Sequence, residues 1–365
     1  MRIAFLSWRD TGHPDGGGSE EYIEHIAEQL VARGHDVTIR CAAYEGGPAD
    51  EVRRGVRFVR RGHRLTVYPR GLAWAVLGCG RRCDVVVEVV NGIPFGLGLV
   101  RRRRTVPLVH HLHREQWRII YPGWKGRTGW LIERATIRAY RGLSFLTVSR
   151  ATADDLVAHG VPRAAVHVVR NGAERRPRQD VERSPLTLCT LSRLVPHKRI
   201  EQAVDVVVAL APRFPGLRLV VVGAGWWEPE LRRYVAAAGA DRLVHLVGRV
   251  DAEERDRVLA SATAMLLPSV REGWGLAVVE AALQGTPTVA YRWAGGVAES
   301  VADQETGLLV DTPAGLETAV ARLLTDQDLW TRLSAACRDR ALTYKWEQAA
   351  ADVEALLRDQ VAGLP

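Results

Sequence analysis

Short runs of aliphatic and β-branched residues alternate with stretches of helical periodicity along almost the whole chain. Runs of this kind bounded by polar turns are typical of strands. Strands with helices between them indicate parallel, doubly wound sheets of the α/β class. The predicted strands are Arg2–Leu6, Asp36–Cys41, Val85–Val90, Thr105–Leu112, Ser144–Val148, Val166–Val169, Leu186–Thr190, Leu217–Val222, Leu243–Leu246, Ala262–Leu267, Thr288–Ala290 and Leu308–Val310.

The alternation is interrupted at Asn171–Pro185, which is polar, holds two prolines and lacks periodicity, and therefore resembles a linker. A length of 365 residues also favours two domains. We expect an N-terminal domain over residues 1–175 and a C-terminal domain over 176–345. The amphipathic stretch Trp346–Leu357 predicts a final helix within 346–365, which we expect to pack back toward the N-terminal domain.

Composition narrows the class of protein. Hydrophobic residues make up 47% and charged residues 25%, which is ordinary globular usage and excludes a disordered or fibrous chain. Five scattered cysteines without a CxxC pair argue against a disulfide scaffold or a zinc ribbon and favour a cytoplasmic setting. The first apolar run is too short for a signal peptide, and no run reaches the length of a membrane span.

Charge is uneven along the chain. Residues 1–180 carry 30 Lys and Arg against 18 Asp and Glu, whereas the remainder carries 20 against 24. A basic half indicates an anionic partner such as a nucleotide or an anionic lipid surface. Because only three of the 50 basic residues are lysines, a general arginine bias is the competing explanation.

Three glycine-rich or cationic segments follow predicted strands, where open α/β sheets bind their ligands. Gly16-Gly17-Gly18 lets the backbone approach an anion, although a plain strand–helix turn has the same composition. Arg193 and Lys198 could clamp a diphosphate, or be solvated surface charges. Gly223-Ala224-Gly225 could face a nucleotide or form an ordinary turn.

Two carboxylates and a histidine cluster complete the candidates. Glu272 precedes a glycine-flanked turn, and Glu280 lies in the following helix. Both carboxylates could bind sugar hydroxyls near the start of that helix. The alternative is that Glu272 is an ordinary helix-start acid and Glu280 a solvent-facing residue. His110, His111 and His113 end a strand. Alternate strand residues face opposite ways, so a metal site is disfavoured, and a single histidine near a ligand is the preferred interpretation.

Several motifs, in order, resemble those of retaining GT-B glycosyltransferases of family 4. The segment from Pro268 to Pro287 resembles the E-x7-E signature, with Glu272 and Glu280 as its carboxylates. Gly17–Glu20 resembles the GGxE loop, and Arg193 with Lys198 resembles the R-x4-K pair. The further matching segments are Arg33–Val37, Thr147–Ser149, Val169–Gly172, Gly295–Glu299 and Thr306–Leu309. The resemblance covers nearly the whole chain and implies two Rossmann-like domains facing across a cleft.

The resemblance implies a role for each matched residue. Arg193 and Lys198 would hold the donor diphosphate and stabilise the leaving charge. Glu272, with the backbone of Gly273, Trp274, Gly275 and Leu276, would bind the transferred sugar. Glu280 would bind the ribose, and Gly17 and Gly18 would approach the phosphates. Gly223 and Val250 also belong to the implied donor site.

The same resemblance indicates which histidine lies near the sugar and whether a metal ion is needed. Val109–Leu112 is similar to the family's VHDL segment, which makes His110 the match for its histidine near the sugar, with His113 as a rival. His111 departs from the family by replacing the aspartate. The resemblance implies no metal and no cofactor, the donor being a substrate. The DxD triplet Asp326–Asp328 lies in a helical stretch and reads as a helix start.

The expected activity is retaining transfer of a sugar from a nucleotide-diphosphate donor to a hydroxyl of a lipid-linked, glycan or small natural-product acceptor. A catalytically silent nucleotide-sugar-binding protein and a glycan phosphorylase-like enzyme are the alternatives. A nucleic-acid partner is not expected, because no nucleic-acid-binding module is recognisable. Arg101–Arg104 and the Trp-rich stretch Arg114–Trp130 suit an anionic membrane surface or a phosphorylated acceptor, or are a solvated arginine face over an aromatic core.

Overall fold

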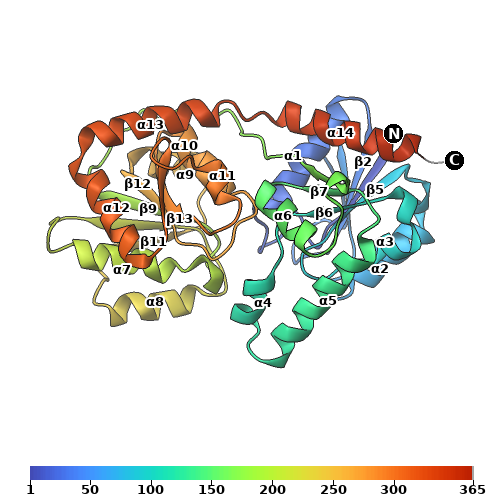
Figure 1. Ribbon diagram of the computed structural model, residues 1–365, viewed down its shortest axis with the longest axis horizontal. Helices are drawn as coiled ribbons and strands as arrows, with labels where there is room; N and C mark the ends of the chain where they lie inside the picture. The colour runs from blue at the N-terminus through green and yellow to red at the C-terminus, as the bar shows by residue number, and fades with distance from the viewer. Residues whose placement is uncertain (364–365) are drawn as a thin grey trace. The chain divides into compact units, whose positions relative to one another are not determined.

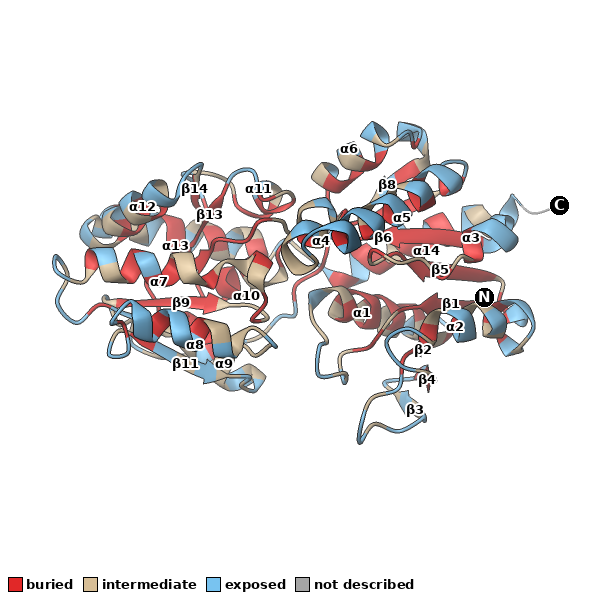
Figure 2. Cartoon of the chain, turned by 90° about the horizontal axis from the view of Figure 1, so that it is seen from below, coloured by how far each residue is buried: buried red, intermediate tan, exposed pale blue. Residues whose placement is uncertain are grey.

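The computed structural model describes residues 1–363 and divides them into two compact units, residues 1–172 together with 345 onward, and residues 173–344 (Figure 1). Each unit is an α/β structure around one sheet. Strands of both sheets are largely buried, because helices cover their two faces (Figure 2). No helix within residues 1–363 is long and apolar enough to cross a membrane.

The first unit contains an eight-stranded sheet of order β3-β4-β2-β1-β5-β6-β7-β8. All neighbouring strands are parallel except β3 and β4. Its strands are β1 (Arg2–Leu6), β2 (Asp36–Cys41), β3 (Asp50–Arg53), β4 (Val56–Arg60), β5 (Val85–Val89), β6 (Thr105–Val109), β7 (Phe145–Thr147) and β8 (Val166–Val168). Its helices are α1 (Gly18–Ala32), α2 (Val67–Val76), α3 (Leu97–Val100), α4 (Arg114–Ile120), α5 (Trp124–Tyr140), α6 (Arg150–Ala158) and α14 (Trp346–Ala362), with 3-10 turns η1 (Cys79–Arg82), η2 (Arg102–Arg104) and η3 (Arg163–Ala165).

The second unit contains a six-stranded, all-parallel sheet of order β11-β10-β9-β12-β13-β14. Its strands are β9 (Thr187–Leu191), β10 (Arg218–Val222), β11 (Val244–Gly248), β12 (Ala264–Leu267), β13 (Thr288–Tyr291) and β14 (Gly307–Val310). Its helices are α7 (Ile200–Leu210), α8 (Glu228–Ala237), α9 (Ala252–Ser261), α10 (Leu276–Leu283), α11 (Val297–Ser300), α12 (Pro313–Thr325) and α13 (Gln327–Ala341), with the 3-10 turn η4 (Pro196–Lys198).

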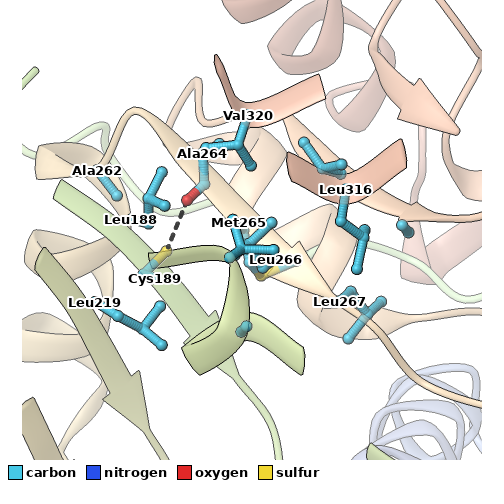
Figure 3. Close-up of a cluster of buried hydrophobic side chains, with 14 of the residues drawn as sticks. Leu188, Cys189, Leu219, Ala262, Ala264, Met265, Leu266, Leu267, Leu316 and Val320 are labelled. Atoms are coloured by element: carbon cyan, nitrogen blue, oxygen red, sulfur yellow. Dashed lines mark hydrogen bonds between the residues drawn. The ribbon is translucent and has the colours of Figure 1, made fainter. Parts of the chain in front are cut away.

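The core of the second unit lies on the central strands β9 and β12 (Figure 3). Leu188 and Cys189 of β9 pack beside Ala264 and Met265 of β12, all fully buried. The Cys189 thiol donates to the Ala264 carbonyl, with 3.7 Å between sulfur and oxygen. Burial raises the pKa of this thiol to about 12, so Cys189 stays protonated and acts as a small core residue.

The predicted strands are present, most with ends shifted by one to three residues, but the sequence patterns missed β3 and β4. These two strands form an antiparallel hairpin whose turn, Arg54-Gly55, has positive φ at both positions, as a two-residue hairpin requires. Arg60 at the end of β4 is fully buried because its guanidinium pairs with Asp10 at 2.5 Å and Glu51 at 2.6 Å. A buried arginine and a charged edge strand break the apolar pattern that identifies a strand.

The final helix α14 packs on α1 within the first unit, although it follows the second unit in sequence (Figure 1). Glu354 of α14 is the polar centre of this contact. Its carboxylate pairs with Arg33 after α1, with His35 Nε2 at 2.8 Å and with Arg358 at 2.7 Å. The Arg33 hydrogen bond is the largest of several effects that lower the pKa of Glu354 to about 2.

We predict that Glu354→Gln lowers the free energy of unfolding at pH 7 by roughly 1 to 2 kcal/mol. Because the pKa of the carboxyl is lowered on folding, its contribution is complete above about pH 4.5 and is lost as the pH falls toward 2. Thermal denaturation from pH 7 to pH 3 should show the difference from wild type narrowing below pH 4.5. Glu347→Gln, at an exposed carboxylate on the same helix, is the control. A gap that is constant with pH would contradict the assignment.

Candidate functional site

The predicted donor residues of the second unit all follow carboxyl ends of its parallel strands. Arg193 and Lys198 follow β9, Gly223 follows β10, Val250 follows β11, and the segment beginning at Pro268 follows β12. Parallel strands place these ends at one edge of the sheet. The chain runs from β9 to β10 on one side and returns to β12 on the other, so this edge includes a topological switch point, where such sheets bind ligands.

Lys198 and Glu272 meet at this switch point. The Lys198 Nζ donates to Glu272 Oε1 at 2.5 Å, and both side chains are mostly buried. The two segments are fastened by their backbones as well, because the Val270 N–H donates to the His197 carbonyl at 2.9 Å. The sequence therefore brings one cation and one carboxylate from neighbouring strand ends to a fixed position.

The loop that carries Glu272 is held by backbone contacts with the loop after β13. The Glu272 N–H donates to the Ala294 carbonyl at 2.9 Å, and its own carbonyl accepts from Gly296 at 3.1 Å. A Cβ on Gly296 would lie 1.9 Å from the Gly273 oxygen, so only glycine allows this approach. The Glu272 main chain is thereby fixed.

Gly275 has a φ of +94° and is the N-cap of α10, and Leu276 is the first residue of that helix. The first N–H groups of a helix have no partner within it. Trp274 is buried and packs edge-on against Tyr344 with ring centroids 5.4 Å apart. Its indole is part of the core, so the turn offers a ligand its backbone rather than an aromatic face.

Glu280 has a different partner from Glu272. It pairs with Arg255 of α9, which also contacts Asp256 at 3.1 Å. Sequence reasoning missed Arg255, because the residue lies on the exposed-looking face of a charged helix 25 positions away. The two carboxylates of the E-x7-E segment thus occupy distinct electrostatic environments, one beside a lysine and one beside an arginine.

Gly223 and Gly225 serve backbone packing. A Cβ on Gly223 would lie 1.9 Å from the Ser192 oxygen, and one on Gly225 would lie 2.2 Å from the Leu194 oxygen. The loops after β9 and β10 can therefore touch main chain to main chain. The Trp227 indole donates to the Glu201 carboxylate of α7 at 2.5 Å, so this side chain packs on that helix, whereas Trp226 is 54% exposed.

In the first unit the loop between β1 and α1 is compact and carries Gly17 and Gly18. The Glu20 carboxylate accepts from the Gly17 N–H at 2.9 Å and pairs with buried Arg9 at 3.2 Å. Glu24 accepts from the backbone and the hydroxyl of Thr11, each at 2.8 Å. Two buried carboxylates of α1 thus hold the loop that precedes their own helix.

The two candidate histidines have different surroundings. His110 is buried beside β7 and α6, with its carbonyl accepting from the Thr152 hydroxyl at 3.0 Å. Its ring lies edge-on to Tyr22 at 5.4 Å, and its Nε2 has no hydrogen-bond partner within residues 1–363. Burial lowers the pKa of His110 to about 4, so the ring is neutral at pH 7.

His113 is 19% exposed along its side chain and is bound by a buried carboxylate. Glu133 of α5 accepts from the His113 Nδ1 and the Trp117 Nε1, each at 2.9 Å, and from the His113 backbone at 3.2 Å. Glu133 was not among the residues predicted from the sequence. The third histidine, His111, contacts Gln116 through Nε2 at 3.0 Å.

The DxD triplet begins a helix, as predicted. Asp326 is the N-cap of α13, and its carboxylate accepts from the Leu329 N–H at 2.9 Å. The triplet precedes that helix rather than following a strand of the sheet.

Two family models match the two halves of the chain. The model described as "Glycosyl transferase 4-like domain" matches residues 17–172, and the one described as "Glycosyl transferases group 1" matches residues 173–340. Among curated proteins, a GDP-mannose-dependent alpha-(1-6)-phosphatidylinositol monomannoside mannosyltransferase of Mycobacterium tuberculosis is 32% identical, over 94% of this chain and 95% of that protein. A glycogen synthase of the same organism is 28% identical, over 96% and 92%.

Solved structures agree with the fold. Sucrose-phosphate synthase from Thermosynechococcus elongatus superposes with a TM-score of 0.82 at 21% identity, covering 100% of both chains. HepE of Anabaena, solved in complex with UDP-glucose, superposes with a TM-score of 0.76 at 17% identity, covering 98% of this chain and 100% of that one.

The two Rossmann-like domains have the GT-B fold of these neighbours, and the two family models identify the chain as a glycosyltransferase. The chain belongs to the family of group 1 glycosyl transferases with a 4-like N-terminal domain.

Proposed function

We propose that this glycosyltransferase moves a sugar from a nucleotide-diphosphate donor to a hydroxyl acceptor with retention of configuration. The contact between Lys198 and Glu272 at the switch point of the second sheet is the observation that carries the proposal. A diphosphate needs a fixed cation, and sugar hydroxyls need a fixed acceptor oxygen. These two groups stand side by side on strand ends, where ligands of such sheets bind. Relatives whose names specify GDP-mannose and a neighbour bound to UDP-glucose support a nucleotide-sugar donor.

The remaining roles follow the family motifs. Arg193 and Lys198 both bind the donor diphosphate. As negative charge develops on the leaving oxygen of the diphosphate, the Lys198 ammonium shifts part of its interaction from Glu272 to that oxygen. Glu272 and the N–H groups near Leu276 bind the sugar. Glu280, oriented by Arg255, binds the ribose. For the first unit, the family motifs assign His110 to the sugar and the backbone at Gly17 and Gly18 to the phosphates.

A thermal-shift screen against UDP-, GDP-, ADP- and dTDP-sugars identifies the donor. A ligand at a hundred times its dissociation constant adds about 2.7 kcal/mol of stability. Donor hydrolysis then separates an enzyme from a silent binding protein, and the anomeric configuration of the product tests retention.

We predict that Lys198→Ala lowers turnover about a hundredfold, equivalent to roughly 3 kcal/mol of transition-state stabilisation, while the fold remains intact. The lost group is the fixed cation at the leaving diphosphate. Steady-state rates and melting temperature are measured together. Arg213→Ala, which removes an exposed cation of the same unit, is the control and should leave the rate unchanged. Turnover within twofold of wild type in a folded Lys198→Ala protein contradicts the role.

We predict that sugar transfer survives EDTA. Arg193 and Lys198 provide two fixed positive charges for the diphosphate, and Asp326 of the DxD triplet is used as a helix cap. Initial rates are compared after extensive chelation and after adding back Mg²⁺ or Mn²⁺. Complete loss of transfer in chelator with recovery on metal addition would show that a metal neutralises the diphosphate.

We further propose peripheral contact with the cytoplasmic, anionic face of a membrane, made by the outer side of α4 and α5. Figure 1 shows α4 and the first turns of α5 projecting beyond the other helices of the first unit. The inner face of α5 holds the buried carboxylate Glu133, whereas its outer face carries Trp124, 71% exposed, and Leu131, 59% exposed. Residues 114–141 contain seven basic and two acidic residues. An exposed tryptophan and leucine among cations suit an anionic bilayer surface.

The Arg101–Arg104 segment contributes less to this surface than the sequence suggested. The Arg101 guanidinium donates to the carbonyls of Ala75, Gly80, Arg81 and Cys83. Arg102 donates to the Ala139 carbonyl at 3.1 Å. Burial lowers the pKa of Arg101. Arg101 and Arg102 tie chain segments of the first unit together, although Arg102, Arg103 and Arg104 are exposed, and we centre the proposed membrane surface on α4 and α5.

We predict that the protein co-sediments with phosphatidylglycerol vesicles more than with phosphatidylcholine vesicles, because each well-placed basic residue adds about 1 kcal/mol at an anionic surface. High salt should weaken the binding. The double variant Trp124→Ser/Leu131→Ser should lose most of it, whereas Leu77→Ser, at a leucine 79% exposed after α2, should not. Equal binding to the two vesicle types, or no effect of the double variant, would remove the membrane from the proposal.

A further inference from the structure

His113 and Glu133 form a hydrogen-bonded pair that is not part of the proposed donor site. Glu133 is fully buried on the inner face of α5, and its carboxylate accepts hydrogen bonds from His113 and Trp117 in the segment after β6. A buried carboxylate without donors would be strongly destabilising. The side chain is therefore held in one position by its partners, and it holds them in turn.

The contact fixes which nitrogen of His113 carries a proton. A carboxylate can only accept, so the His113 Nδ1 must donate across the 2.9 Å that separates it from Glu133 Oε1. In the neutral ring, Nε2 then carries a lone pair. No other group within residues 1–363 hydrogen-bonds this Nε2, and the side chain is partly exposed. The contact with Glu133 thus leaves Nε2 as the acceptor nitrogen of a partly exposed ring.

The position of His113 in the first sheet indicates what the Nε2 atom could bind. His113 follows β6, at the carboxyl edge of the first sheet, three residues beyond buried His110. The same edge carries the β1–α1 loop with Gly17. His110 cannot present a polar atom to solvent, because its ring is enclosed beside Tyr22. His113 is partly exposed, so it can hydrogen-bond a hydroxylated ligand at this strand end.

We infer that His113 Nε2 accepts a hydrogen bond from a hydroxyl of the acceptor, a polyhydroxylated molecule such as a sugar or a cyclitol, and that Glu133 is the positioning residue that orients the ring. The inference rests on the proposed function, because it assumes an acceptor that brings hydroxyl groups to the first unit. Glu133 itself does not touch the acceptor. It acts by keeping the proton on Nδ1 and the lone pair on Nε2.

The first test needs no acceptor. In protein labelled with ¹⁵N at histidine, the ring nitrogen shifts of His113 report its tautomer directly. We expect the Nδ1–H form in the wild type and a mixture of forms in Glu133→Gln, whose amide both donates and accepts. A wild-type ring in the Nε2–H form would overturn the inference.

The second test separates the two ring nitrogens by substitution. Asn at position 113 keeps a donor near Nδ1 and lacks Nε2. With UDP-glucose or GDP-mannose as donor and maltoheptaose or D-inositol 3-phosphate as acceptor, we expect His113→Asn to lower kcat/KM for the acceptor roughly tenfold, as expected for one lost hydrogen bond. Donor hydrolysis by water should remain within twofold. His159→Asn, at a histidine whose Nδ1 contacts the Asp155 carbonyl, is the control.

A double-variant comparison tests whether Glu133 acts through His113. If it does, Glu133→Gln/His113→Asn has the same acceptor kcat/KM as His113→Asn alone. Multiplied losses would show that Glu133 has a separate role. Acceptor kinetics of His113→Asn within twofold of wild type, or no transfer by the wild type to either acceptor together with an unresponsive Nε2 shift on adding them, would overturn the inference. A wild type that neither binds nor hydrolyses any nucleotide sugar refutes the proposed function instead, while the tautomer result still stands on its own.

Discussion

The ammonium of Lys198 and the carboxylate of Glu272 are opposite charges removed from most of the solvent, and the geometry of the second unit depends on keeping them together. Each would be costly to bury alone, so the loops after β9 and β12 are constrained to meet. The backbone bond from Val270 to His197 and the contacts of the Glu272 main chain with Ala294 enforce the same arrangement. A group that is already oriented before charge develops needs little reorganisation during the reaction, which is the main electrostatic advantage of a folded site.

Much of the fold was predictable because its strands are buried on both faces. The strands β1, β10 and β12 are nearly continuous apolar runs, as expected for sheets covered by helices on both faces. The hairpin of β3 and β4 was not predictable in this way. The buried guanidinium of Arg60 in this hairpin is stabilised by Asp10 and Glu51. Asp10 lies 50 positions earlier in the sequence, so the hydrophobic pattern gives no sign of this ion pair.

In the candidate site, too, the sequence predicted the positions of strand ends but not the side-chain partners supplied by helices. Motif order located the strand ends that carry Lys198 and Glu272, because topology sends parallel strand ends to one edge. It did not locate Glu133 or Arg255, whose helices look like ordinary charged surface. Their side-chain partners depend on which helix face turns inward, and the inward face of α5 carries the carboxylate of Glu133 beside buried Ile137 and Tyr140. Side-chain partners of this kind become visible only when the helix is placed on its sheet.

The return of the chain to its first unit through α14 constrains how the protein is made. The N-terminal sheet is synthesised first, but the helix that packs on α1 and supplies Glu354 is synthesised only after the whole second unit. The N-terminal unit therefore lacks one of its covering helices until α14 has been synthesised, and its apolar face near α1 stays open while the second unit is being made. A fragment ending near residue 172 would carry the same defect permanently. Separating the two domains for expression calls for a fusion of residues 345–365 to the N-terminal piece.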